Sequence, residues 1–111
     1  MNSSAEQRRS ARATVEVPAT LQISGRQMQA KTANISEGGA FVALPDPPPV
    51  GTMVKLALDL GDGVVRAFSE VVWIRLPGSG PSPGMGLRFR YFLHDGRDVL
   101  RGFLWEASAT G

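Results

Sequence analysis

The chain of 111 residues has no cysteine and one histidine, His94. The absence of cysteine excludes a disulfide framework and a cysteine-ligated metal site, and it suits a reducing compartment. No apolar run approaches the length of a membrane span, and the polar segment 1–7 lacks the apolar stretch of a signal peptide. We therefore expect a cytoplasmic protein with a single core.

Residues suited to catalysis are also scarce. His94 has no motif around it, and Ser36 lacks the leading glycine of a nucleophile elbow. The carboxylates show no pair at the spacing of metal ligands or of a general acid and base. The glycines of 78–84 are spaced too widely for a dinucleotide-binding loop and lead into an expected strand. We expect a binding module with no metal or cofactor, not an enzyme.

What the chain does contain is a cluster of arginines near its start. The formal net charge of +2 is too small to indicate a nucleic-acid-binding surface, but Arg8, Arg9 and Arg12 lie close together, opposed only by Glu6. Arginine presents a planar fork of donors that fits phosphate or the O6/N7 edge of guanine, and its flat cation can stack on a base. Alone, such a segment is more often a solvated tail.

A second short motif, Asn34-x-Ser36-x-x-Gly39, supplies mixed donors and acceptors suited to the edge of a base. Its plainer interpretation is a turn in which Asn34 and Ser36 bond their own backbone and glycine permits an unusual φ. Together with the arginine segment, it predicts a site for an anionic guanine nucleotide.

The strand pattern between the two motifs predicts that they meet. Residues 15–23 alternate between apolar and polar, Ser24-Gly25 is a turn signal, and residues 26–35 can return as a second strand. If Ile23 pairs with Arg26, then Ala13 lies opposite Ser36 and Val15 opposite Asn34. Pro18 cannot donate to the ladder, which favours an edge position or a bulge for the first strand.

Further strands are expected at 39–44, 54–60, 64–76 and 85–91, and a stiff proline-rich loop at 45–49. From 94 to 108 the apolar period changes to that of a helix, with Asp95 as a candidate cap. Trp73 and Trp105 lie within apolar stretches and are interpreted as packing groups. About six one-sided antiparallel strands favour an all-β barrel plugged or flanked by the C-terminal helix.

The two motifs and several downstream segments resemble the PilZ domain, a bacterial receptor module for cyclic di-GMP. The segment 8–12 fits its RxxxR pattern and 34–39 its [D/N]xSxxG pattern. The similarity continues through Pro49-Val50-Gly51-Thr52, Glu70-Val71-Val72-Trp73 and Gly84-Met85-Gly86-Leu87-Arg88-Phe89. It implies an arm at 1–12 that carries the arginines and a β-barrel with a C-terminal helix at 13–108.

The resemblance also implies roles for individual residues. Arg8 and Arg12 would bind the phosphates and guanine edges of cyclic di-GMP, and Arg9 would add charge or stack on a base. Asn34 and Ser36 would bond a guanine, while Gly38 and Gly39 would let the backbone approach. The ligand would order the arm against the 34–39 turn, which changes the surface shown to a downstream effector protein.

Two alternatives stay open at this point. The domain could be a PilZ-like interaction module that binds no nucleotide, or a small barrel that binds single-stranded nucleic acid through exposed aromatics. We expect a monomer or a ligand-dependent dimer, with no insertion in a membrane and no nucleic-acid partner.

Overall fold

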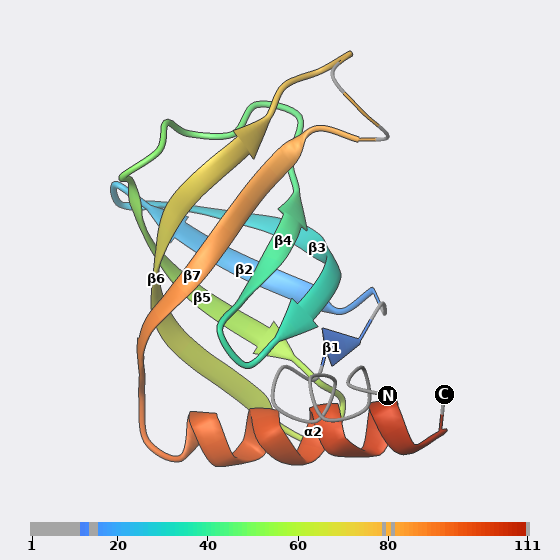
Figure 1. Cartoon of the computed structure of the whole chain (residues 1–111). Coiled ribbons are helices and arrows are strands. Elements are labelled where there is room, and N and C mark those ends of the chain that lie inside the picture. Colours follow the sequence, from blue (N-terminus) through green and yellow to red (C-terminus); the bar gives the residue numbers. More distant parts are fainter. Residues whose placement is uncertain (1–11, 14–15, 79, 81, 111) are drawn as a thin grey trace.

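The computed structural model describes residues 12–13, 16–78, 80 and 82–110 and contains an antiparallel β-barrel with one C-terminal helix (Figure 1). Barrel neighbours run β3-β2-β5-β6-β7-β4, and pairing of β4 with β3 closes the ring, while β1 adds to the edge of β3. The predicted fold class is therefore confirmed. The elements are β1 (Arg12–Ala13), β2 (Pro18–Ile23), β3 (Arg26–Ser36), β4 (Gly39–Ala43), β5 (Met53–Asp59), β6 (Val64–Arg75), β7 (Gly84–Phe92) and α2 (Gly96–Thr110).

The barrel core follows from the alternation of apolar side chains along the strands. In β5 the side chains of Val54, Leu56 and Leu58 are buried, whereas Met53 before them and Lys55 between them are exposed. Each fully buried aliphatic side chain contributes about 1.5–3 kcal/mol to folding. The largest fully buried side chains come from the six strands β2 to β7 and from the helix: Leu21, Ile35, Leu56, Leu58, Met85, Leu100, Leu104, Val42, Val54, Val65, Val71 and Thr32.

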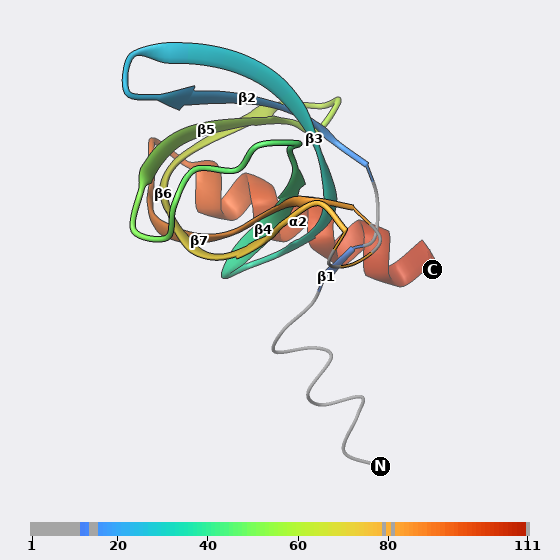
Figure 2. The same ribbon diagram turned by 90° about the horizontal axis from the view of Figure 1, so that it is seen from above.

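The C-terminal helix flanks one end of the barrel (Figures 1 and 2). Leu100 and Leu104 lie one turn apart and are fully buried, with Val99 and Phe103 half-buried beside them. Asp95 directly precedes α2, and its carbonyl oxygen accepts a hydrogen bond from the Val99 N–H at 3.1 Å. The predicted helical face thus covers the barrel, and the opposite face of α2 lies on the surface.

The first hairpin has the register that the sequence predicts. Ser24 (φ 52°) and Gly25 (φ 81°) both have left-handed backbones, as in the two-residue turns that match strand twist. The ladder then runs from Ile23 opposite Arg26 to Pro18 opposite Lys31.

Nearer the N-terminus the predicted register is wrong by one residue. Arg12, not Ala13, lies opposite Ser36. The predicted register still holds at Val17, whose carbonyl oxygen accepts the Thr32 N–H at 3.0 Å and whose N–H donates to the buried Oγ1 of Thr32 at 3.1 Å. The offset therefore arises between Ala13 and Val17. Val15, predicted opposite Asn34, lies outside the described residues.

The edge position that Pro18 favoured for the first strand is wrong, because β2 is an internal strand of the barrel. Strand β2 lies between β3 and β5, but Pro18 opens it, and pairing with β5 begins one residue later, at Ala19. Proline has no N–H to donate, but at this position β2 loses no hydrogen bond to β5.

The two tryptophans differ in their surroundings. Trp73 is 45% exposed, yet its ring stacks on Phe41 at 5.2 Å and covers Gly86, where a Cβ would lie 2.1 Å from Trp73 Nε1. It packs on the outer surface of the barrel. Trp105 is 66% exposed, so the interpretation of this residue as a packing group is wrong. The helical period turns it away from the face that carries Leu104.

Candidate functional site

The turn that joins β3 to β4 carries the second motif. The Ser36 hydroxyl accepts a hydrogen bond from the Gly38 N–H at 3.3 Å and donates one to the Gly39 carbonyl oxygen at 3.3 Å. This is the local bonding that the plainer interpretation predicted for Ser36. The unusual φ predicted for glycine is wrong, because neither Gly38 nor Gly39 has a positive φ. The Ser36 oxygen keeps a second lone pair that a ligand donor can use. The residue therefore shapes the turn and still offers a polar group.

The two glycines of the turn have different surroundings. A Cβ on Gly39 would lie 2.0 Å from the Leu87 carbonyl oxygen, so the approach of β7 alone requires glycine there. A Cβ on Gly38 would meet nothing within 4 Å, and the Gly38 carbonyl accepts the Phe89 N–H at 2.9 Å. Gly38 thus presents an exposed, narrow backbone to solvent, and the need for Gly39 is explained by strand packing.

Asn34 lies on β3 two residues before Ser36, and its side chain is exposed. The β3–β4 register shifts between Thr32 and Asn34, and Asn34 then pairs with Phe41. Such a bulge re-aims the side chains beside it, and here it leaves both Ala33 and Asn34 exposed. The amide of Asn34 is therefore available on the outer surface, at the same end of β3 as the Ser36 turn.

The first motif reaches this turn through β1. The main chain of Arg12 lies directly opposite Ser36 in the β1–β3 ladder. The structure thus brings the last residue of the arginine segment to the turn, as the strand pattern predicted, with the one-residue offset described above. Arg8 and Arg9 lie outside the described residues.

Two further arginines, not singled out from the sequence, lie next to the turn. Arg88 of β7 pairs with Gly39, and its side chain is exposed. Arg101 of α2 donates from Nε to Oε2 of Glu37, at the tip of the turn, at 2.5 Å. The alternation of residues 85–91 is enough to predict that the Arg88 side chain faces outward. The contact of Arg101 with Glu37 has no local signal in the sequence, because 64 residues separate them.

The charges and polar groups around the turn are suited to binding an anion. The Glu37 carboxylate is the negative group at the tip, and Arg101 offsets its charge. Arg88 adds positive charge, and the exposed amide of Asn34 offers a neutral polar group. Such a surface can hold a ligand that combines phosphate with hydrogen-bonding bases.

Within the described part of the chain, no three histidine or acidic side chains converge as metal ligands. The same residues include no helix long and apolar enough to cross a membrane.

Comparison with known proteins identifies related folds. No curated protein matches the chain. Among solved structures, the inhibitor of motility MotI/DgrA of Bacillus subtilis superposes with a TM-score of 0.79 at 17% identity, covering 91% of this chain and 51% of that one. This chain thus spans about half the length of MotI/DgrA.

Two isolated PilZ domains match over nearly their whole length. The PilZ domain of YcgR from Escherichia coli, solved with cyclic di-GMP, has a TM-score of 0.71 at 14% identity and covers 92% of both chains. The PilZ domain of CeSA from a cellulose-synthesizing bacterium has a TM-score of 0.60 at 17% identity, covering 86% of this chain and 96% of that one. The sequence model of the PilZ domain matches residues 6–104. Since that match includes both motifs, the barrel and most of the helix, this chain belongs to the PilZ domain family.

Proposed function

We propose that this chain is a cyclic di-GMP receptor that passes its signal to a separate effector protein. The observation that carries the proposal is the pairing of Arg12 with Ser36, because it brings the last residue of the RxxxR segment opposite a residue of the NxSxxG segment. Membership of a family in which the YcgR domain was solved with cyclic di-GMP supports the same ligand.

In this proposal the ligand lies between the arm and the turn. Arg8 and Arg12 bind the phosphates and guanine edges, and Arg9 adds charge or stacks on a base. Asn34 and Ser36 form hydrogen bonds with a guanine. The ligand approaches the backbone closely at Gly38, which is open, and at the side of Gly39 that β7 does not cover. Arg88 is a further candidate for phosphate contact because it lies opposite Gly39.

The output of the proposed receptor is a change of surface. Binding of a dianionic ligand draws the arginine segment onto the turn, which the effector then recognises in its new position. The description of MotI/DgrA as an inhibitor of motility fits a PilZ-type adaptor that acts on another protein. A catalytic role has no support among the side chains at the turn, so a binding module remains our proposal.

Isothermal titration tests the ligand directly. Cyclic di-GMP should bind more tightly than cyclic di-AMP, because adenine presents a donor where guanine O6 accepts from arginine. GMP should bind more weakly still, because it lacks the second base and the cyclised backbone. Equal affinity for the adenine analogue would contradict the guanine assignment. If no nucleotide bound, the alternative of a PilZ-like interaction module without a nucleotide site would be favoured.

The nucleic-acid alternative has one observation in its favour. Phe68 and Tyr91 form an aromatic pair on the outside of the barrel at 5.0 Å, with Lys55 Nζ 5.8 Å from the Phe68 ring, and Tyr91 is 55% exposed. If a polynucleotide stacked on this pair, its binding should weaken steeply with salt, because neutralising its many phosphates releases many counterions. A dinucleotide releases only about two, so titration at several salt concentrations separates the ligands.

A further inference from the structure

Trp105 is an aromatic side chain of α2 that the barrel does not use for packing, and it is 66% exposed. The other tryptophan, Trp73, stacks on Phe41, whereas no ring or cation among the described residues contacts the indole of Trp105. Alanine is a better helix former than tryptophan, so neither core packing nor helix propensity explains a tryptophan at this position. An exposed indole offers a flat face on which a nucleobase can stack.

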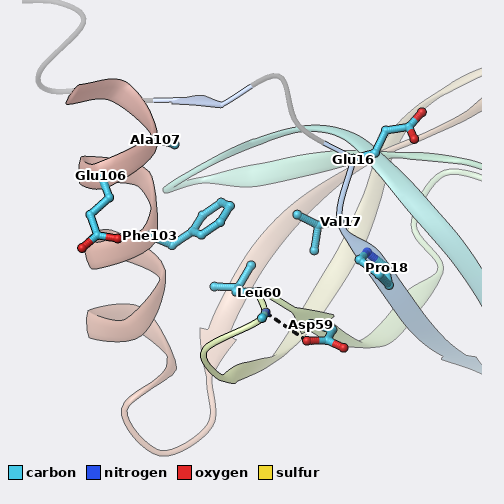
Figure 3. Close-up of a pocket in the computed structure, with 9 residues that line it drawn as sticks. Glu16, Val17, Pro18, Asp59, Leu60, Phe103, Glu106 and Ala107 are labelled. Carbon is cyan, nitrogen blue, oxygen red and sulfur yellow. Dashed lines mark hydrogen bonds between the residues drawn. The ribbon is translucent and has the colours of Figure 1, made fainter. Parts of the chain in front are cut away.

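The two flanks of α2 face different parts of the molecule. On one flank, Phe103 projects across a groove toward Val17 and Leu60, near the start of β2 and the end of β5 (Figure 3). With 3.6 residues per turn, Trp105 lies about 160° around the helix axis from Phe103. Trp105 therefore belongs to the other flank, away from that groove.

The flank that carries Trp105 meets the 36–39 turn. Arg101 Nε donates to Glu37 Oε2 at 2.5 Å. Trp105 follows Arg101 by one helical turn, and side chains at this spacing are neighbours with Cβ atoms about 5–6 Å apart. The Cα–Cβ bond of a helical residue tilts toward the N-terminus of the helix, so that of Trp105 is directed toward the Arg101 end of α2. The indole thus lies beside the turn that carries the second motif.

Strand β1 connects this flank to the arginine segment. It contacts α2, and Figures 1 and 2 both draw it beside the C-terminal half of the helix. The same strand places Arg12 opposite Ser36. The surface around the turn is therefore bordered by α2, with Trp105 next to β1 and Arg101 next to Glu37.

We propose that Trp105 extends the nucleotide site onto α2 and stacks on one guanine of cyclic di-GMP. The inference rests on the proposed function and adds a residue to the same site. Arg12 and Arg88 supply charge for the phosphates, and Asn34 and Ser36 supply hydrogen bonds for a base edge. An indole supplies the apolar face that none of these groups has. Stacking depends little on which base is bound, so Trp105 contributes affinity and the polar groups contribute the preference for guanine.

Isothermal titration of three variants tests the ring itself. Trp105→Ala should bind cyclic di-GMP about tenfold more weakly than the natural sequence and should weaken cyclic di-AMP by a similar factor. Trp105→Phe keeps an aromatic face and should lose only about threefold, whereas Trp105→Leu keeps apolar bulk without a ring and should resemble alanine. Natural affinity in Trp105→Ala, or leucine binding as well as phenylalanine, overturns the proposal.

Tryptophan fluorescence separates this inference from the proposed function. The chain has two tryptophans, so Trp73→Phe leaves only Trp105 to emit and Trp105→Phe leaves only Trp73. Because a stacked guanine quenches indole emission, cyclic di-GMP should quench the first variant strongly and the second little. Titration heat without quenching in Trp73→Phe contradicts the stacking and leaves the receptor proposal intact, while no binding by the natural sequence contradicts both. A Trp105→Ala change in ligand-free mass by light scattering, with unchanged affinity, would assign the indole to a second copy and also contradict the stacking.

Discussion

The two hairpin turns at the ends of β3 differ in what holds them. The Ser24–Gly25 turn stands alone: both residues have positive φ, and a Cβ on Gly25 would meet nothing within 4 Å. The 36–39 turn is contacted by three other elements. Strand β1 pairs with Ser36, β7 bonds to Gly38, and Arg101 of α2 reaches Glu37.

This difference separates a turn that only reverses the chain from a turn that can carry function. Local backbone preference is enough for Ser24–Gly25, whose chemistry can be read from two adjacent residues. The 36–39 turn places polar groups at fixed positions because distant segments support it. Changes at the two turns should therefore have different consequences, and the following predictions compare them.

The largest effect is expected from alanine at the two turn glycines. Gly39→Ala forces a methyl group against the Leu87 carbonyl and should lower the free energy of unfolding by about 2–3 kcal/mol. Gly25→Ala has space but a left-handed φ, and should cost about 1–2 kcal/mol. Urea denaturation measures both, and titration should show impaired cyclic di-GMP binding only for Gly39→Ala. A more stable Gly39→Ala protein would contradict the packing explanation.

The next effect concerns the arginine at β1. Arg12→Ala should weaken cyclic di-GMP binding about tenfold to a hundredfold, the effect of losing a charged hydrogen bond worth about 1.5–3 kcal/mol. Arg26→Ala, next to the Ser24–Gly25 turn, removes the same charge and should leave the affinity unchanged. If both variants bound equally well, the arm would not be part of the site.

Ser36→Ala should affect both stability and binding. The hydroxyl makes two local hydrogen bonds at 3.3 Å, so its removal should lower the free energy of unfolding by about 1 kcal/mol. Ser24→Ala at the other turn supplies the control for titration, where binding should be retained. If the Ser36→Ala variant bound cyclic di-GMP with full affinity, the hydroxyl would have only a structural role in the turn.

The smallest effect is expected from the exposed pair between α2 and the turn. Arg101→Ala leaves the Glu37 carboxylate without its partner beside an anion site, and binding should weaken about twofold to fivefold. Adding Glu37→Gln to the same chain should restore the affinity, because the repelling charge is gone. Failure of this rescue would mean that Arg101 contacts the ligand itself. Titration in low salt gives the best resolution.

Much of the barrel could be predicted from the sequence. Alternation places Val54, Leu56 and Leu58 inside, and the Ser24-Gly25 signal fixes the register of the first hairpin. Both properties depend on residues near one another in the chain, since side chains of a strand alternate faces and a two-residue turn sets the first pair. The one-residue offset at Arg12 could not be found in this way, because β1 pairs with β3 apart from the hairpin ladder, and the turn does not set the register of a separate strand.

The candidate site also has features that the sequence predicts and features that depend on tertiary contacts. The sequence by itself determined which chemical groups are available, in two motifs and an expected hairpin, and it determined the closed barrel through the pattern of its strands. Only the tertiary structure decided that Gly39 is required by β7, that Arg88 and Arg101 border the turn, and that Trp105 faces solvent. The physical reason is that a strand period or a turn preference acts over a few residues, whereas these contacts form only when barrel closure and helix packing bring distant segments together.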